Sequence, residues 1–279
     1  MWTILKIELF KIFKRPRTYI SFAAISAIVL LIQLALYLDG DTYVQFMLQS
    51  INETFDVNGN IMNGYLICYV VLQLLLIHVP LLIILVGADM TAGEANMGTL
   101  RLITSRPVSR FHLMMGKFLA TATYTLLLLV WMAFLALLFS VLVFGTGDML
   151  IFKSEQVVIL RKADILWRYV AAFGFAAIAM LTVASLAFLL SIFAENSIGP
   201  IVATMSVIIV ATILTTMDLP LFNALAPFLF TSHMLGWKGF FDDPVNYEAI
   251  FRSAGILLFH IFLFIGTAIL IFKRKDILS

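Results

Sequence analysis

The chain has 279 residues, of which 62% are hydrophobic and only 12% are charged, and its formal net charge is +2. A soluble domain carries about twice that charged fraction, so the composition excludes a water-soluble protein and predicts an all-α, polytopic membrane protein. The single cysteine excludes an intrachain disulfide.

The first segment, 1–17, is predicted to form an amphipathic interfacial elbow helix. Apolar residues recur from Trp2 to Phe13 at spacings of three and four, while lysines occupy much of the remaining surface. Such a helix lies at the membrane surface with its lysines directed to lipid phosphates, and Pro16 turns the chain into the bilayer. A cleaved signal peptide is the competing interpretation, but the next apolar run exceeds the usual length of about 7–15 residues for a signal core.

Residues 18–279 are predicted to form a single six-helix transmembrane domain. About 20 apolar residues are needed to cross the hydrocarbon, and a crossing segment must be helical because its amides find no partners in lipid. The short gap at 194–197, between the fourth and fifth runs, predicts an antiparallel hairpin. The six runs are 18–38, 64–88, 117–144, 167–193, 198–217 and 254–272.

The distribution of charge predicts the orientation. With the amino terminus inside, the inner segments hold twelve Lys and Arg residues and the outer segments hold six. The positive-inside rule therefore places both termini in the cytoplasm, together with a coupling loop at 89–116. The outer broken segment, 218–250, has three prolines among aromatic residues. These aromatics either anchor the protein at headgroup depth or belong to short broken helices that cap a substrate path.

A candidate substrate path is marked by two histidines in spans, a proline and two outer aromatics. Ionisable groups inside spans are functional candidates, although a lone neutral imidazole is also satisfied by ordinary packing. No further His, Cys or carboxylate accompanies either histidine at a suitable spacing, so no metal site is predicted. The five candidate residues are His78, Pro80, His260, Phe228 and Trp237.

Catalytic motifs are missing from the sequence. It has no Gly-Lys-Ser/Thr phosphate loop, no His-Glu-x-x-His and no Gly-x-Ser-x-Gly. The chain is therefore not expected to be an enzyme or to hold a cofactor itself. No Asp or Glu lies near the middle of a predicted span, which disfavours transport driven by protons or sodium.

The coupling loop carries a patterned series of basic and turn-forming residues. A solvated loop that obeys the positive-inside rule explains the arginines but not the glycine, the proline and the serine that can cap the next helix. The series consists of Glu94, Gly98, Thr99, Leu100 and Arg101, followed by Arg106, Pro107, Val108, Ser109 and Arg110, and then Gly116 and Lys117.

This series resembles the cytoplasmic loop after the second span in permease subunits of ATP-binding-cassette (ABC) transporters of the type-2 export class. The basic ending at 272–276 is similar to that family's carboxyl terminus, and the layout resembles the family along the whole chain. The resemblance implies a homo- or heterodimer of permease subunits joined to ABC ATPase subunits, which bind ATP and Mg. We expect an exporter in a bacterial inner (plasma) membrane, in contact with membrane lipids and not with nucleic acid.

On this resemblance, the segment from Gly98 to Arg110 is expected to dock in a cleft of the ATPase subunit. Its three arginines would offer charge-assisted hydrogen bonds to acidic residues there. Glu94 either offers the opposite charge or pairs with Arg101. Glu195, in the turn between the fourth and fifth spans, is a second expected contact. The alternative function is a membrane scaffold or sensor subunit that moves no substrate.

Overall fold

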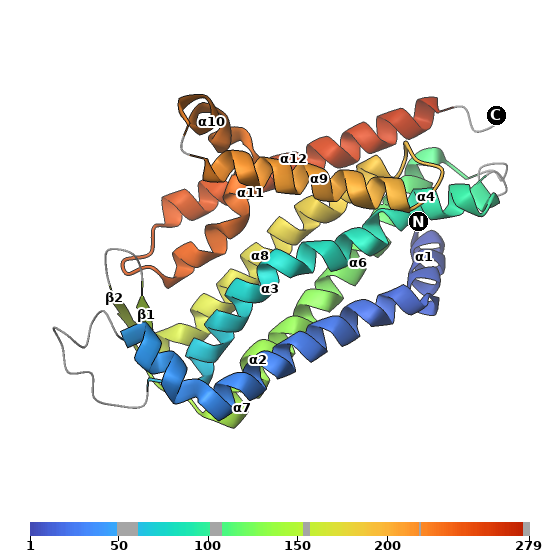
Figure 1. Cartoon of the computed structure of the whole chain (residues 1–279). Coiled ribbons are helices and arrows are strands. Elements are labelled where there is room, and N and C mark those ends of the chain that lie inside the picture. Colours follow the sequence, from blue (N-terminus) through green and yellow to red (C-terminus); the bar gives the residue numbers. More distant parts are fainter. Residues whose placement is uncertain (49–60, 101–107, 153–156, 218, 276–279) are drawn as a thin grey trace.

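The structure of the protein is a computed structural model that describes residues 1–48, 61–100, 108–152, 157–217 and 219–275 (Figure 1). Most of this part of the chain is helical, and the long helices run between the two ends of an elongated bundle. The predicted helical class is therefore confirmed, with one small β-hairpin added to it.

The chain begins with α1 (Trp2–Lys14), breaks at Arg15 and continues as α2 (Pro16–Leu48). Proline suits the first position of a helix, because the amide at that position has no partner within the helix. Helix α2 leaves helical geometry at Asp39. The predicted first span at 18–38 therefore corresponds to the part of α2 that precedes this kink.

Helix α3 (Gly64–Gly87) contains the predicted second span and starts where the side chain of Asn63 accepts hydrogen bonds from two backbone amides. It is bent by 53° between Gly64–Leu75 and His78–Gly87. Pro80 accounts for the bend, because it cannot donate a hydrogen bond to the carbonyl of residue 76 and its ring crowds the preceding turn.

The predicted coupling loop at 89–116 contains helical segments at both ends. Helix α4 (Asp89–Asn96) occupies its start, and α6 (Arg110–Ala133) already includes its last seven residues. Helix α6 continues through the π-helical η1 (Phe134–Phe139) into α7 (Ser140–Phe144). The third span therefore begins seven residues before the predicted 117, because polar side chains of its first turns face other helices instead of water.

Strands β1 (Met149–Phe152) and β2 (Val157–Leu160) form the antiparallel hairpin, which the sequence did not predict. They are followed by α8 (Lys162–Leu190) and α9 (Ile198–Thr216), where the fourth and fifth spans were predicted. The connection between these helices is 191–197, longer than the predicted 194–197, and the chain still turns back on itself there (Figure 1).

The predicted broken segment is divided into short helices before α12 (Tyr247–Arg274). Because α12 starts at residue 247 and not at 254, this segment ends at residue 246. Arg168 of α8 holds its last short helix, donating from Nη1 to the carbonyls of Phe240 and Asp242 at 2.8 and 2.7 Å. The short helices are α10 (Pro220–Leu225), η2 (Ala226–Phe228), α11 (Phe230–His233) and η3 (Met234–Phe241).

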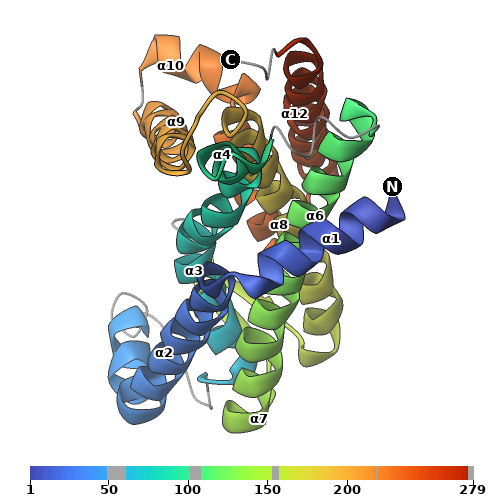
Figure 2. The same cartoon turned by 90° about the vertical axis from the view of Figure 1, so that its right-hand side faces the viewer.

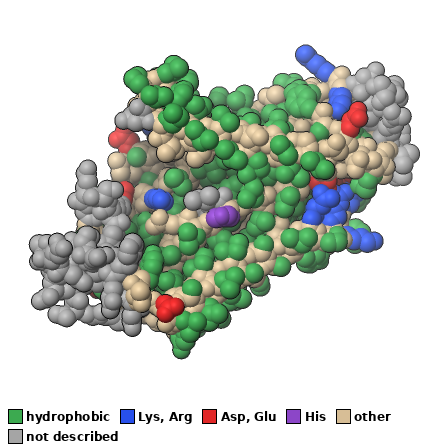
Figure 3. All heavy atoms as spheres, in the orientation of Figure 1, with side chains coloured by type: hydrophobic (Ala, Val, Ile, Leu, Met, Phe, Trp, Pro, Cys, Tyr) green, Lys and Arg blue, Asp and Glu red, His purple; other side chains and the backbone are tan. Residues whose placement is uncertain are grey.

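Five helices in the described part of the chain are long and apolar enough to cross a membrane, and the bent α3 brings the number to as many as six. The protein is therefore a multi-pass membrane protein. Seen from the end that carries α1 and α4, the long helices surround α8 (Figure 2). Hydrophobic side chains cover the middle of the visible face, and Lys and Arg gather at the end with α1 and α4 (Figure 3).

Candidate functional site

A buried group of charged side chains joins α1, α4 and α6 at one end of the bundle. At its centre is Lys117 of α6, which has 0% of its surface exposed. Its Nζ lies 2.7 Å from Oε2 of Glu94 and 3.2 Å from Oε2 of Glu8, and it donates to the carbonyl of Met90 at 3.1 Å. Lys11 bridges the same two carboxylates, at 2.7 Å from Glu94 and 2.9 Å from Glu8.

A second cluster lies beside the first, around the buried Asp89 at the start of α4. Arg15 pairs with one carboxylate oxygen, and Arg17 lies 2.9 Å from the other. Ser197, in the connection between α8 and α9, also donates a hydrogen bond to Asp89. We call the two clusters together the charged junction; it consists of Glu8, Lys11, Arg15, Arg17, Asp89, Glu94 and Lys117.

The neighbouring charges keep Glu94 and Lys11 of the junction ionised. Burial by itself would raise the pKa of Glu94, but the attraction of Lys117 and the hydrogen bond from Lys11 outweigh it and hold this pKa below its ordinary value. Burial likewise acts to lower the pKa of Lys11, and its hydrogen bonds to Glu94 and Glu8 outweigh burial and raise it. The acid and the base therefore stay charged at neutral pH.

Close packing holds the helices that carry these charges. A Cβ atom on Gly116 of α6 would lie 2.6 Å from Cγ2 of Ile4, so only glycine lets α1 approach α6 this closely. A Cβ atom on Gly93 would lie 2.5 Å from the carboxylate of Asp89 in the same way. The short distances of the junction thus depend on two glycines as well as on opposite charges.

Gly98 ends the short helix that supplies the acids. Its φ of +67° lies in the left-handed region, and its amide donates to the carbonyl of Ala95 at 3.0 Å. This is the usual role of glycine at a helix end. The hydroxyl of Thr99 then bonds the carbonyl of Glu94 at 3.3 Å. A turn thus lies at Gly98, one of the turn-forming residues of the series, whereas Arg101, Arg106 and Pro107 lie outside the described residues.

Glu94 has two partners within the described residues, whereas the partner expected for it within the chain, Arg101, lies outside them. Its carboxylate is buried and paired with Lys11 and Lys117, so it faces the protein interior and is not free to meet another subunit. Glu195 is exposed, as a surface contact requires.

Arg110 is engaged within the chain as well. Its Nη1 donates to the carbonyls of Phe272, Lys273 and Lys275 at 3.2, 3.0 and 2.8 Å. A cation beside unpaired carbonyls stabilises a helix C-terminus, so Arg110 joins the start of α6 to the end of α12. Lys275 donates in turn to the carbonyl of Ile192, just beyond α8, at 2.7 Å.

The five candidate residues of the substrate path are not connected to one another by their hydrogen bonds or ring contacts. Nδ1 of His78 lies 2.7 Å from the carbonyl of Leu74, and Nδ1 of His260 lies 2.8 Å from that of Ile256. Each imidazole is thus satisfied within its own helix. Pro80 is buried in α3, Trp237 is buried against Tyr69 and Phe241, and Phe228 is 74% exposed.

The sequence analysis missed the role of Glu8, Lys11, Asp89 and Lys117. Glu8 lies outside the predicted apolar stripe of α1 and yet turns inward, while Trp2 of that stripe is exposed. One signal was present in the sequence. Glu8 is the only acidic residue before Asp39, and Asp89 and Glu94 are the only acids between residues 57 and 147. Isolated acids in basic, apolar surroundings need a cationic partner.

Comparisons with known proteins match nearly the whole chain to one family. Residues 16–278 match the profile of a family described as "Protein of unknown function (DUF2705)". The chain is also similar to the uncharacterized protein YhcI of Bacillus subtilis (strain 168), with 31% identity over 120 residues. This similarity covers 41% of the chain and 37% of the relative's own length. Neither description states a substrate, a partner or an activity.

Proposed function

We propose that this chain, which belongs to the family described as a protein of unknown function (DUF2705), is the membrane-spanning subunit of an ABC transporter. In this proposal the bent α3 counts as one crossing, which gives six spans with both termini in the cytoplasm and α1 at the membrane interface. A separate ATPase subunit binds ATP and Mg, and the membrane is a bacterial inner membrane.

The observation that carries the proposal is the charged junction. The resemblance expects the segment after the second span to receive a movement from the ATPase, and α4 is the first described helix of that segment. Ion pairs link α4 to α1 through Glu94 and Lys11, and to α6 through Glu94 and Lys117. Ser197 links it to the α8–α9 connection. A displacement of α4 therefore reaches several helices at once.

The pairing inside the chain changes which residues meet the ATPase. Because Glu94 and Arg110 are engaged within the subunit, we assign them to transmission of the movement and not to docking. The docking surface then includes the exposed Met97 and the turn at Gly98, and the exposed Glu195 is a second expected contact. Outward transport of the substrate follows from the resemblance alone.

Co-purification tests the proposal directly. The full-length chain is tagged in its native host, extracted in a mild detergent and analysed for bound proteins and for ATPase activity. We expect an ABC ATPase subunit at a stoichiometric amount. Its consistent absence under conditions that keep other membrane complexes intact would refute the proposal. If the ATPase binds but the complex in liposomes moves no substrate, the alternative function as a scaffold or sensor subunit is favoured.

A matched pair of glycine variants tests the docking surface. Gly98 and Gly145 both have a positive φ, +67° and +74°, and a Cβ atom would meet no neighbour within 4 Å at either site. Replacement by alanine therefore strains the backbone at opposite ends of the bundle, and strains it at least as much at Gly145, whose ψ of −172° belongs to a region that essentially only glycine adopts. We expect Gly98→Ala to weaken ATPase binding and Gly145→Ala to leave it unchanged. An equal effect of both would contradict docking at Gly98.

A further inference from the structure

The cations near the amino terminus fall into two groups according to what they face. Lys11, Arg15 and Arg17 each contact a carboxylate of the charged junction. Lys6 and Lys14 have no carboxylate partner among the residues that the structure describes. Instead, Lys6 Nζ lies 5.4 Å from the ring centre of Trp2, and Lys14 Nζ lies 5.6 Å from that of Phe10. Two positive charges on α1 are thus left without a counter-charge from the described protein.

These two lysines and their aromatic partners form one face of α1. Trp2, Lys6, Phe10 and Lys14 follow each other at intervals of four residues, which keeps them on one side of a helix. All four are exposed. Aromatic rings at headgroup depth, with lysines extended toward phosphate, are the arrangement that helices adopt at a membrane interface. We call these four residues the outer stripe.

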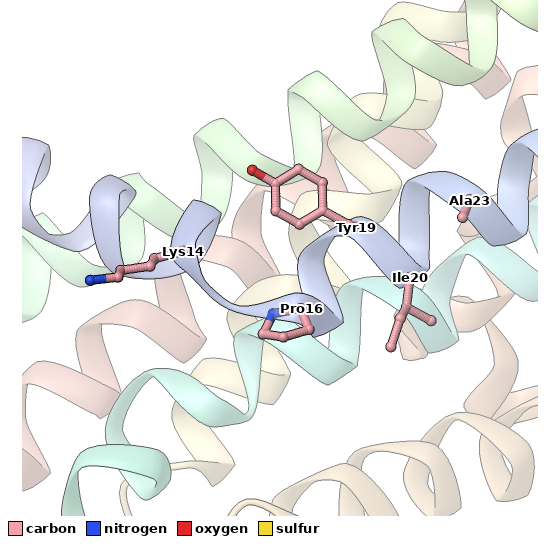
Figure 4. A pocket seen from close by; sticks show the side chains of 5 residues that line it. All are labelled: Lys14, Pro16, Tyr19, Ile20 and Ala23. Atoms are coloured by element: carbon pink, nitrogen blue, oxygen red, sulfur yellow. The ribbon is translucent and has the colours of Figure 1, made fainter.

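The outer stripe ends at an open groove where α1 meets α2. The groove has a volume of about 450 Å³ and is lined by Lys14, Pro16, Tyr19, Ile20 and Ala23. Figure 4 shows Pro16 at the bend, Lys14 extending from the last turn of α1, and the other three side chains on the first turns of α2. The lining therefore offers one cation before the bend and apolar side chains after it, which we call the apolar wall.

We propose that this elbow groove binds the headgroup of an anionic phospholipid. Lys14 holds the phosphate, and Tyr19, Ile20 and Ala23 contact the glycerol and the first part of an acyl chain that runs along α2. The charge complements a headgroup with net negative charge, and the apolar wall favours a lipid over free phosphate, which has no chain to place there. The proposal does not depend on the transport function.

The groove lies next to the charged junction along the chain. Lys14 lines the groove, and Arg15, the next residue, pairs with Asp89 of the charged junction. The break between α1 and α2 is thus held on its outer side by lipid and on its inner side by α4. An anionic lipid in the groove fixes the elbow in the place that the junction requires.

Native mass spectrometry of the purified full-length protein tests the site. The protein is titrated with phosphatidylglycerol and with phosphatidylcholine of the same acyl chains, and the bound lipid is counted. We expect a preference for phosphatidylglycerol that Lys14→Gln reduces about fivefold, the effect of one lysine near an anionic headgroup. The control is Lys273→Gln, because Lys273 is also exposed and also lies 5.6 Å from a phenylalanine ring, that of Phe111, but outside the groove.

A second variant tests the apolar wall without changing charge. Ala23→Leu fills part of the groove, so it should also reduce retention of phosphatidylglycerol while Lys14 is intact. Equal retention by wild type, Lys14→Gln and Ala23→Leu would overturn the proposal. So would a loss as large in Lys273→Gln as in Lys14→Gln, since that result means a diffuse attraction of lipid to any exposed lysine. Displacement of the lipid by millimolar inorganic phosphate would also overturn it.

Discussion

Removing the ammonium of Lys117 is the sharpest test of the charged junction. In Lys117→Met the side chain keeps its approximate length, but Glu8 and Glu94 lose the fully buried cation that contacts both. They are then left to share Lys11, whose side chain is 34% exposed. Breaking a buried pair by removing one partner costs about 3–5 kcal/mol, because the other charge stays buried. At about 2 °C per kcal/mol for a chain of this size, the midpoint of thermal unfolding in detergent should fall by about 6–10 °C.

A double-mutant cycle separates the ion pair from a loss of packing. Glu94→Gln removes one of the two facing acids, so the double variant Lys117→Met, Glu94→Gln should lose about 1–3 kcal/mol less than the sum of the single changes. Lys273→Met, at an exposed site, should lie within about 0.5 kcal/mol of wild type. Strict additivity in the cycle, or a Lys117→Met protein as stable as wild type, would refute the assignment of Lys117 as the centre of the junction.

Three further predictions follow from the same structure. The lowered pKa of Glu94 contributes stability that is lost as pH falls below the ordinary value of 4.5, and the raised pKa of Lys11 contributes stability that is lost as pH rises past 10.5. The midpoint of thermal unfolding should therefore be constant between about pH 6 and 9 and fall on either side of that range. A transition near pH 7 would contradict this prediction. Gly116→Leu should displace α1 and lower the free energy of unfolding by about 1–3 kcal/mol, whereas Gly174→Leu should be tolerated, because a Cβ atom there meets nothing within 4 Å. Limited proteolysis should cut the amino terminus faster in Gly116→Leu than in Gly174→Leu. Arg168→Met leaves two carbonyls of the η3 region unpaired, so hydrogen exchange should rise in that segment and remain unchanged in α4.

Hydropathy predicted the existence of the long helices well, because the requirement for apolar length and internal hydrogen bonds holds wherever a segment crosses lipid. The bend in α3 was also readable, since Pro80 removes a backbone donor. The ends of the helices were predicted less well. A hydropathy pattern treats each Lys or Glu as facing water, so Lys117 was placed at the very start of the third span, whereas it is a fully buried residue two turns inside α6.

The partners of individual charges lay beyond what the sequence alone predicts. The pairing of Glu8 with Lys117 joins residues 109 positions apart, and it depends on how closely α1 packs against α6. Local spacing offered Arg101 as one alternative partner of Glu94, but it could not indicate Lys11 and Lys117, which come from other elements and pair with Glu94. Counting Lys and Arg for the positive-inside rule showed that they are more numerous in the inner segments than in the outer ones. The count did not distinguish Lys14, which faces outward, from Arg15, which pairs with Asp89.

The ion pairs of the charged junction have a role other than stabilising the fold. A buried ion pair is often no more stabilising than well-packed apolar residues, so stability alone does not explain it. Apolar helix faces tolerate a shift along their axes, whereas Lys117 keeps both of its carboxylates only at one relative position of α1, α4 and α6. We therefore infer that the junction fixes register. Fixed register is what a subunit needs if a displacement of α4 is to move α6 instead of sliding past it. On the proposed transport function, a Lys117→Met protein should therefore keep ATPase binding while losing the coupled movement.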